Sequence, residues 1–189
     1  MHETDDNLLL RWRAGDAAAY EVLFTRCYPL VFRAARTLLG DAEADDLAQE
    51  ALLALYRQPP AAGASVVAWL CRVALNRGRN LLRGERRAAA RAALLLPANP
   101  ADPQDLAVMA DERAGVRRAL ARLPERQAQV LALRHAGLSY AQVAAALDLA
   151  PGSIGTLLAR AERAFAEIYA HTEITALTPR GDDDRTVLR

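Results

Sequence analysis

The chain has 189 residues, of which 52% are hydrophobic, and its 24 basic residues, all arginine, give a formal net charge of +1. This length and composition suit one domain or two small ones with real cores. The sequence has neither a signal-peptide pattern nor an apolar run long enough to cross a bilayer, so we expect a soluble, cytoplasmic protein without membrane insertion. Cys27 and Cys71 lie in apolar periodic segments without a Cys-x-x-Cys or His/Cys cluster, which predicts buried free thiols rather than a disulfide or a metal site.

The charges are separated along the chain. Residues 41–50 hold five acids and no base, whereas residues 72–91 hold seven arginines and a single acid, Glu85. The plainer interpretation is that both charged runs are solvated helix faces. Separation this sharp indicates two surfaces that meet two different partners.

The first half of the chain is predicted to be helical. A short amphipathic helix over residues 6–13 is followed by a restart at Gly15 and Asp16. The second helix carries an aromatic residue at every fourth position, and we interpret this ladder as core; it consists of Tyr20, Phe24, Tyr28 and Phe32.

Two further helices are expected before residue 92. Gly40 closes the second helix, and Asp41 is predicted to cap a third, which runs to Arg57 and stops before Pro59. Ser65 is predicted to cap a long fourth helix, which continues through about residue 91.

A proline-rich segment, "LLLPANPADPQD" over residues 94–105, then predicts an extended, flexible linker. A second helical block follows over residues 110–169, and the tail from His171 lacks a core-forming pattern, so we expect it to be disordered. The predicted fold is therefore all-α, with a helical domain over residues 1–92, a linker over 93–109, a second helical domain over 110–170 and a tail over 171–189.

The second domain has the pattern of a helix-turn-helix. Pro124 suits the first position of a helix that ends near Gly137. Ser139 and Gln142 form a capping box for the helix over residues 140–147, flanked by a hydrophobic staple between Leu138 and Val143. A tight turn and Pro151 then open the last helix. The alternative is a helix pair that only packs.

The exposed face of this last helix is small and polar. Backbone N–H groups at its start could hold a phosphate, and its hydroxyls and arginines could contact DNA. A bidentate base reader near the helix start is missing, so we expect this module alone to bind DNA weakly. The residues on this face are Gly152, Ser153, Thr156, Ala159, Arg160 and Arg163.

In the first domain, the third helix presents an acidic outward stripe. An exposed leucine beside an amide and two carboxylates is typical of a docking surface for a basic protein. A metal site is disfavoured because all three histidines are remote. The stripe consists of Asp46, Gln49, Glu50, Leu53 and Arg57.

The fourth helix presents the complementary basic stripe. Arginines at spacings of three and four can follow a DNA backbone, and asparagines among them can contact a base edge. The stripe consists of Arg72, Asn76, Arg79, Arg83 and Arg86, flanked by Asn80 and Arg87, with Trp69 at its head.

Three blocks together resemble the extracytoplasmic-function (ECF, group IV) sigma factors of bacterial RNA polymerase. "LLRWRAGDAAAYEVLFTRCYPLVFRAARTLLGDAEADDLAQEALLALYR" and "AWLCRVALNRGRNLLRGERR" are similar to the two ends of sigma region 2. "LARLPERQAQVLALRHAGLSYAQVAAALDLAPGSIGTLLARAERAF" is similar to region 4. The resemblance covers about residues 6–169.

The resemblance implies a factor that binds core RNA polymerase and directs promoter recognition and opening, without catalysis or a cofactor. The acidic stripe would contact the polymerase β′ clamp, and region 4 the β flap. The basic stripe with Trp69 would face the -10 element. The -35 element would meet Ser139, Gly152, Ser153, Thr156, Arg160 and Arg163. An anti-sigma factor and a role in stress responses also belong to what the family implies.

Two features depart from the family pattern. Gly155 and Leu157 stand where family members usually carry basic residues, and the loop over residues 58–64 lacks an aromatic residue. Two other hypotheses therefore stay open: a polymerase-independent helix-turn-helix regulator, and a degenerate relative that acts by sequestration.

Overall fold

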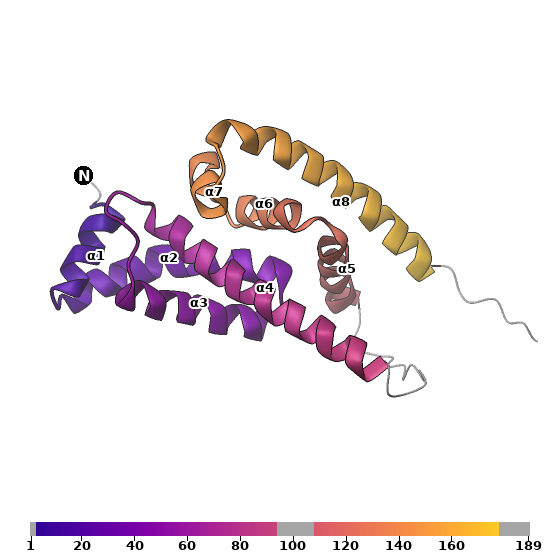
Figure 1. Cartoon of the computed structure of the whole chain (residues 1–189), viewed down its shortest axis with the longest axis horizontal. Coiled ribbons are helices and arrows are strands. Elements are labelled where there is room, and N and C mark those ends of the chain that lie inside the picture. Colours follow the sequence, from indigo (N-terminus) through magenta and orange to yellow (C-terminus); the bar gives the residue numbers. More distant parts are fainter. Residues whose placement is uncertain (1–2, 94–107, 178–189) are drawn as a thin grey trace, which may run out of the picture.

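The computed structural model describes residues 3–93 and 108–177, which form helices and no strand (Figure 1). The predicted all-α fold is confirmed. The elements in chain order are α1 (Asp5–Arg13), α2 (Ala17–Leu38), α3 (Asp41–Arg57), α4 (Val66–Ala93), α5 (Val108–Arg122), α6 (Glu125–His135), α7 (Tyr140–Leu147), the short 3-10 helix η1 (Pro151–Ser153) and α8 (Ile154–Leu177).

Side-chain caps fix where several helices begin. Asp16 accepts hydrogen bonds from the Ala18 and Ala19 amides at the start of α2, at 3.0 and 3.3 Å. Ser65 accepts from the Ala68 amide at 3.4 Å, as predicted for α4. The predicted capping box is also present, since Ser139 accepts from the Gln142 amide and the Gln142 side chain accepts from the Ser139 amide.

Two of the predicted helix starts were wrong by one residue. Gly40, not Asp41, occupies the N-cap of α3, and it has no side chain to cap with, so Asp41 lies inside the first turn. Pro124 is likewise the N-cap residue of α6 rather than its first helical residue, because its ψ of 137° is extended.

The first four helices enclose a core of aliphatic side chains. Leu23, Leu55 and Leu70 come from α2, α3 and α4, and each has no exposed surface. The ladder of rings on α2 was predicted to be core, and here the structure differs. All four rings are only half-buried, and Phe24, Tyr28 and Phe32 pack on the core from outside. The face of α2 that carries Leu23, Cys27 and Val31 fills the interior instead.

The two domains pack directly against each other. α6 lies between α8 and the first four helices, and α7 lies beside the first half of α4 (Figure 1). One continuous cluster of buried residues joins Leu70 and Leu75 of α4 to Val143 and Leu147 of α7. The prediction of two domains joined only by a linker is therefore incomplete. Apolar faces of the two domains also bury each other.

The end of the second domain also differs from the prediction. α8 continues through Leu177, so residues 171–177 of the predicted disordered tail are helical. No glycine or proline interrupts this segment, and the first proline beyond it is Pro179. The rest of the tail and residues 94–107 of the linker lie outside the described residues.

Within the described ranges, no single helix is long and apolar enough to span a membrane. α7 and the segment Pro151–His171 meet the length and composition criterion only as a pair, and they are bent by 107°.

Candidate protein and nucleic-acid interfaces

The acidic stripe of α3 is exposed as the periodicity predicts. Its five residues point away from the core, while Leu47, Ala51 and Leu55 on the opposite side of the helix are buried. Leu53 is 57% exposed on this face, between charged and amide groups. The structure therefore brings Asp46, Gln49, Glu50, Leu53 and Arg57 together on one accessible face.

Hydrogen bonds orient part of this face. Gln49 donates through Nε2 to Asp45 Oδ2 at 2.9 Å, and Tyr28 donates its hydroxyl proton to Asp45 Oδ1. The bond to Asp45 holds the proton on Tyr28 and raises the pKa of that phenol to about 12. Glu50 forms an ion pair with Arg77 of α4, so one carboxylate of the stripe is already partly compensated.

A shallow aromatic groove continues from this face. Its hollow of about 880 Å³ is bordered by Leu53 and by the rings of Trp12, Tyr20, Phe24 and Tyr56. Trp12 lies between Tyr20 and Tyr56, with ring centroids 4.8 and 5.0 Å apart. Three rings of the ladder that was expected to be core, Tyr20, Phe24 and Tyr28, thus line a surface beside the acidic stripe. Tyr56, which is 55% exposed, was missed by the sequence interpretation.

The basic stripe of α4 is only partly accessible, because the second domain covers several of its members. Arg72 donates through Nε to the Ala146 carbonyl of α7 at 3.1 Å and through Nη2 to the Ala145 carbonyl. Asn76, Asn80 and Arg87 are exposed, and Trp69 is half-buried. The Arg86 side chain lies outside the described residues.

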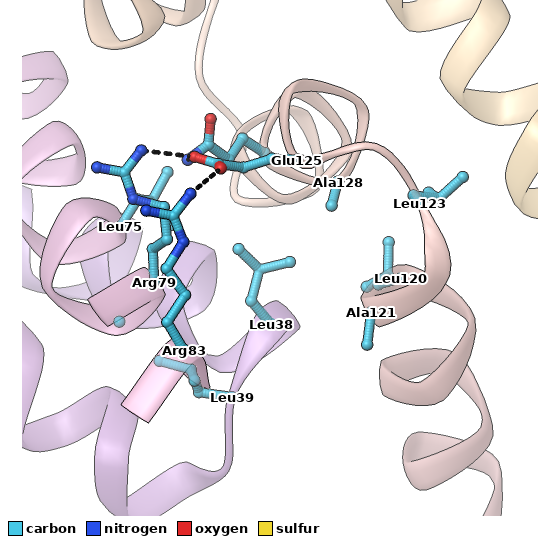
Figure 2. Close-up of a pocket in the computed structure, with 12 residues that line it drawn as sticks. Leu38, Leu39, Leu75, Arg79, Arg83, Leu120, Ala121, Leu123, Glu125 and Ala128 are labelled. Carbon is cyan, nitrogen blue, oxygen red and sulfur yellow. Dashed lines mark hydrogen bonds and ion pairs between the residues drawn. The ribbon is translucent and has the colours of Figure 1, made fainter. Parts of the chain in front are cut away.

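Glu125 of α6 binds two more arginines of the stripe. Its carboxylate is 2.7 Å from Arg79 Nη1 and 3.3 Å from Arg83 Nη2, and dashed lines in Figure 2 mark both contacts. Behind them lies a hollow of about 240 Å³ between α4 and the second domain. Arg79 Nε is buried in this arrangement without a hydrogen-bond partner. The guanidinium is therefore incompletely satisfied, which costs stability.

The start of the last helical segment is accessible. Gly152, Ser153, Thr156, Arg160 and Arg163 are exposed, while Ile154 and Ala161 anchor the opposite side in the core. Ser139 is also exposed, but its hydroxyl oxygen caps α7. The Ser153 hydroxyl donates to the Ala150 carbonyl at 2.7 Å, which fixes the turn in front of α8. The predicted reader surface is therefore present as one face.

Two residues that join the domains carried no signal in the sequence. Glu125 looks like an ordinary acid in the first turn of a helix. Arg33 looks like a solvated residue of α2, but its Nη2 donates to the Ala136 carbonyl at 3.0 Å, across 103 positions of sequence. Both roles depend on how the domains dock.

Neither a metal centre nor a reactive thiol is present in the described part of the chain. It contains no group of three or more His, Cys, Asp or Glu side chains that could hold a metal ion. Cys27 and Cys71 are free and buried, as predicted, and burial raises the pKa of each thiol to about 12.

Comparison with known proteins assigns both helical units. Residues 23–88 match the family model "Sigma-70 region 2", and residues 113–165 match "Sigma-70, region 4". The chain is 34% identical over 185 residues to the ECF RNA polymerase sigma factor SigM of Mycobacterium tuberculosis H37Rv, which covers 90% of this chain and 87% of that protein. The chain belongs to the ECF sigma factors.

Other relatives agree with this assignment. The ECF RNA polymerase sigma-E factor of Escherichia coli K12 is 27% identical over 86% of this chain and 92% of that protein. The fold is also similar to that of CnrH, solved in complex with the cytosolic domain of CnrY, with a TM-score of 0.67 and 22% identity over 89% of this chain and 99% of that one. RpoE of Bartonella quintana, solved with the anti-sigma factor NepR, gives a TM-score of 0.57 at 21% identity, over 80% of this chain and 96% of that one.

This sigma factor is an alternative transcription initiation factor that binds core RNA polymerase and promoter DNA. Its family is not a family of catalysts. The acidic and basic stripes lie within the residues that match region 2, and the small polar face of η1 and α8 lies within those that match region 4.

Proposed function

We propose that this protein is a group IV sigma factor that docks on the polymerase β′ clamp through the acidic stripe of α3. The observation that carries this proposal is the exposed Leu53, which lies among Asp46, Gln49, Glu50 and Arg57. An exposed leucine does not stabilise a solvated helix face. Burying a leucine beside complementary charges does stabilise a protein interface. The β flap would bind region 4.

The basic stripe of α4 then serves the -10 element. Asn76, Asn80 and Arg87 are accessible for this role, whereas Arg72, Arg79 and Arg83 are engaged by region 4 and are released when it moves away from α4. Arg86 and Trp69 complete the proposed surface. Because region 4 covers Arg72 and places the carboxylate of Glu125 against Arg79 and Arg83, full use of the stripe at the -10 element requires the domains to separate.

The exposed face of η1 and α8 serves the -35 element. Ser139, Gly152, Ser153 and Thr156 allow close approach to the DNA backbone, and Arg160 and Arg163 supply positive charge. We propose that polymerase holds this weak reader over the promoter. Tethering can raise apparent affinity by roughly 10²-fold or more.

The remaining assignments follow from the same family membership. We propose region 2 over residues 1–92, a linker over 93–109 and region 4 over 110–170, with both family matches falling inside these bounds. The protein has no catalytic activity of its own and works in the cytoplasm on the nucleoid. The complexes of CnrH with CnrY and of RpoE with NepR support an anti-sigma factor as a further partner.

The test is capture of bacterial core polymerase by the full chain, followed by transcription from a pool of genomic fragments. Stable capture with discrete start sites is the expected result. Capture without transcripts would indicate a sequestering relative. Failure to capture core, with DNA binding by the chain alone, would favour a polymerase-independent regulator.

A further inference from the structure

A basic hollow lies at the junction of the two domains, and no promoter or polymerase contact is assigned to it. Its volume is about 290 Å³, close to that of ten water molecules at about 30 Å³ each. Arg33 and Arg36 come from α2 in region 2, and Arg113 and Arg117 come from α5 in region 4. Four guanidinium groups from two domains therefore line one hollow.

The charge of this hollow is poorly compensated. Among the described residues of its lining, Asp41 is the one acid, so four arginines against one aspartate give these residues a net charge of +3 with His135 counted as neutral. The Asp41 carboxylate is 3.8 Å from Arg36 Nε, at the long end of an ion pair. Arg33 donates one hydrogen bond, through Nη2, to the Ala136 carbonyl. Like charges gathered in this way repel one another unless an anion joins them.

Arg113 and Arg117 contribute most of the N–H donors that have no acceptor among the described residues of the hollow. Among the residues that the structure describes, neither makes an ion pair or hydrogen bond, although the two lie one helical turn apart on α5. Their spacing of four residues places both guanidinium groups on the same side of the helix. Planar guanidinium groups bind phosphate oxygens in pairs. The Thr37 hydroxyl in the lining already donates to the Arg33 carbonyl at 2.8 Å, so the arginines are the groups that would hold the anion.

We propose that this hollow is a binding site for a small anion that carries two or more linked phosphate groups, such as a diphosphate. The volume suits such a group, and the surplus of guanidinium groups matches its charge. DNA supplies the same phosphate chemistry. However, the hollow exists only while α5 lies against α2, whereas the proposed contacts of α4 with DNA require the domains to separate, so a free diphosphate is the favoured occupant.

The proposed site has a consequence for the two domains. An anion held by Arg33 and Arg36 on one side and by Arg113 and Arg117 on the other binds the packed arrangement and not the separated one. Such a ligand shifts the equilibrium towards the packed arrangement. That arrangement keeps Arg72, Arg79 and Arg83 engaged with region 4. The anion therefore opposes DNA binding by the free sigma factor.

The binding test uses pyrophosphate and the full chain in isothermal titration calorimetry. Pyrophosphate should bind with a stoichiometry of one and at least about tenfold more tightly than sulfate at equal ionic strength. The double variant Arg113→Ala/Arg117→Ala should lose about tenfold or more in affinity. Arg122→Ala is the matched control, because Arg122 is exposed on the same helix outside the hollow.

Three outcomes would overturn the site: equal affinity for sulfate, an equal loss in Arg122→Ala, or no loss in the double variant. Circular dichroism of the double variant checks that it is folded. A short DNA duplex that displaces pyrophosphate from the hollow, with the same dependence on Arg113 and Arg117, would assign the site to DNA instead.

The consequence is tested by energy transfer between dyes on Glu21→Cys and Glu162→Cys. Both positions are exposed, and the native thiols are buried. Saturating pyrophosphate should raise the fraction of the packed arrangement, and the Arg113→Ala/Arg117→Ala variant should not respond. Unchanged transfer at saturation would refute the link between the domains. None of these measurements involves polymerase, so they can fail while the proposed sigma function stands.

Discussion

The carboxylate of Glu125 in region 4 lies 2.7 Å from the guanidinium of Arg79 in region 2. In the proposed function, a DNA phosphate binds the same guanidinium group. The contact is partly solvated, since the two side chains are 41% and 36% exposed, so its net strength is modest. In the proposed function, this weak contact breaks when polymerase holds the domains apart, and Arg79 is then released for DNA.

Glu125→Gln should therefore increase DNA binding by the free chain. Each of the two exposed ion pairs that it removes is worth about 0.2–1 kcal/mol. We expect a rise in DNA affinity of about two- to fivefold by fluorescence anisotropy at low salt. Glu21→Gln, at an exposed position of α2 outside both proposed DNA surfaces, is the control and should have no effect. Equal affinity of Glu125→Gln and the native chain would show that the contact does not limit DNA binding.

Asp46→Asn with Glu50→Gln should weaken capture of core polymerase by about tenfold or more, because two charges of the docking face are lost. Both residues are exposed, so the melting temperature should change little. Glu43→Gln, an exposed acid of α3 outside the stripe, should retain capture. A drop in melting temperature without a drop in capture would contradict the docking role.

Arg79→Ala with Arg83→Ala should weaken promoter binding by the holoenzyme while core capture survives. Removing two phosphate contacts should reduce the slope of log affinity against log salt by about 2. The measurement is a filter-binding titration at several salt concentrations. Arg91→Ala, exposed on the same helix, is the control. An unchanged slope in the double variant would place these arginines away from DNA.

The two thiols should resist alkylation in the folded protein. Burial keeps both protonated, since the pKa of each is raised from 9.0 to about 12. In the unfolded chain they ionise near pH 9, so between pH 9 and 12 the folded state binds more protons and stability falls as pH rises. Iodoacetamide should label the native chain slowly at pH 9 and rapidly in denaturant. Cys27→Ala should reduce the loss of stability above pH 9.

Two glycines of α4 should respond differently to alanine. Gly84 has open space around it, so Gly84→Ala should gain about 0.5–1 kcal/mol of stability from helix propensity. At Gly78 the new Cβ would lie 2.8 Å from Leu39 Cδ1 and 3.2 Å from Leu47 Cδ1, both in buried side chains. Gly78→Ala should therefore be less stable than Gly84→Ala in urea titrations. Equal gains would mean that Leu39 and Leu47 move aside freely.

The helices and their surfaces were largely predictable from the sequence. The cap residues Asp16, Ser65 and Ser139 act within three positions of the chain, and such contacts require no knowledge of the rest of the fold. The exposed stripe of α3 follows from helical periodicity alone, since its outward and inward residues separate as predicted. Three concordant blocks were enough to identify the family.

Periodicity was less informative for the ring ladder of α2. A stripe of aromatic residues at four-residue spacing defines a face, but not which face enters the core. Leu23, Cys27 and Val31 form a second apolar stripe on the same helix, and packing against α3 and α4 buries that one. The rings of Tyr20, Phe24 and Tyr28 therefore lie outside the core and line the groove.

What the sequence by itself determined is therefore local: the helices, their caps and the two charged stripes. Tertiary structure alone decided which arginines remain accessible. Arg79 meets Glu125 across 46 positions, and Arg33 meets the Ala136 carbonyl across 103. Contacts of this range depend on how two preformed apolar faces bury each other, and no pattern along one helix encodes the partner that docking brings.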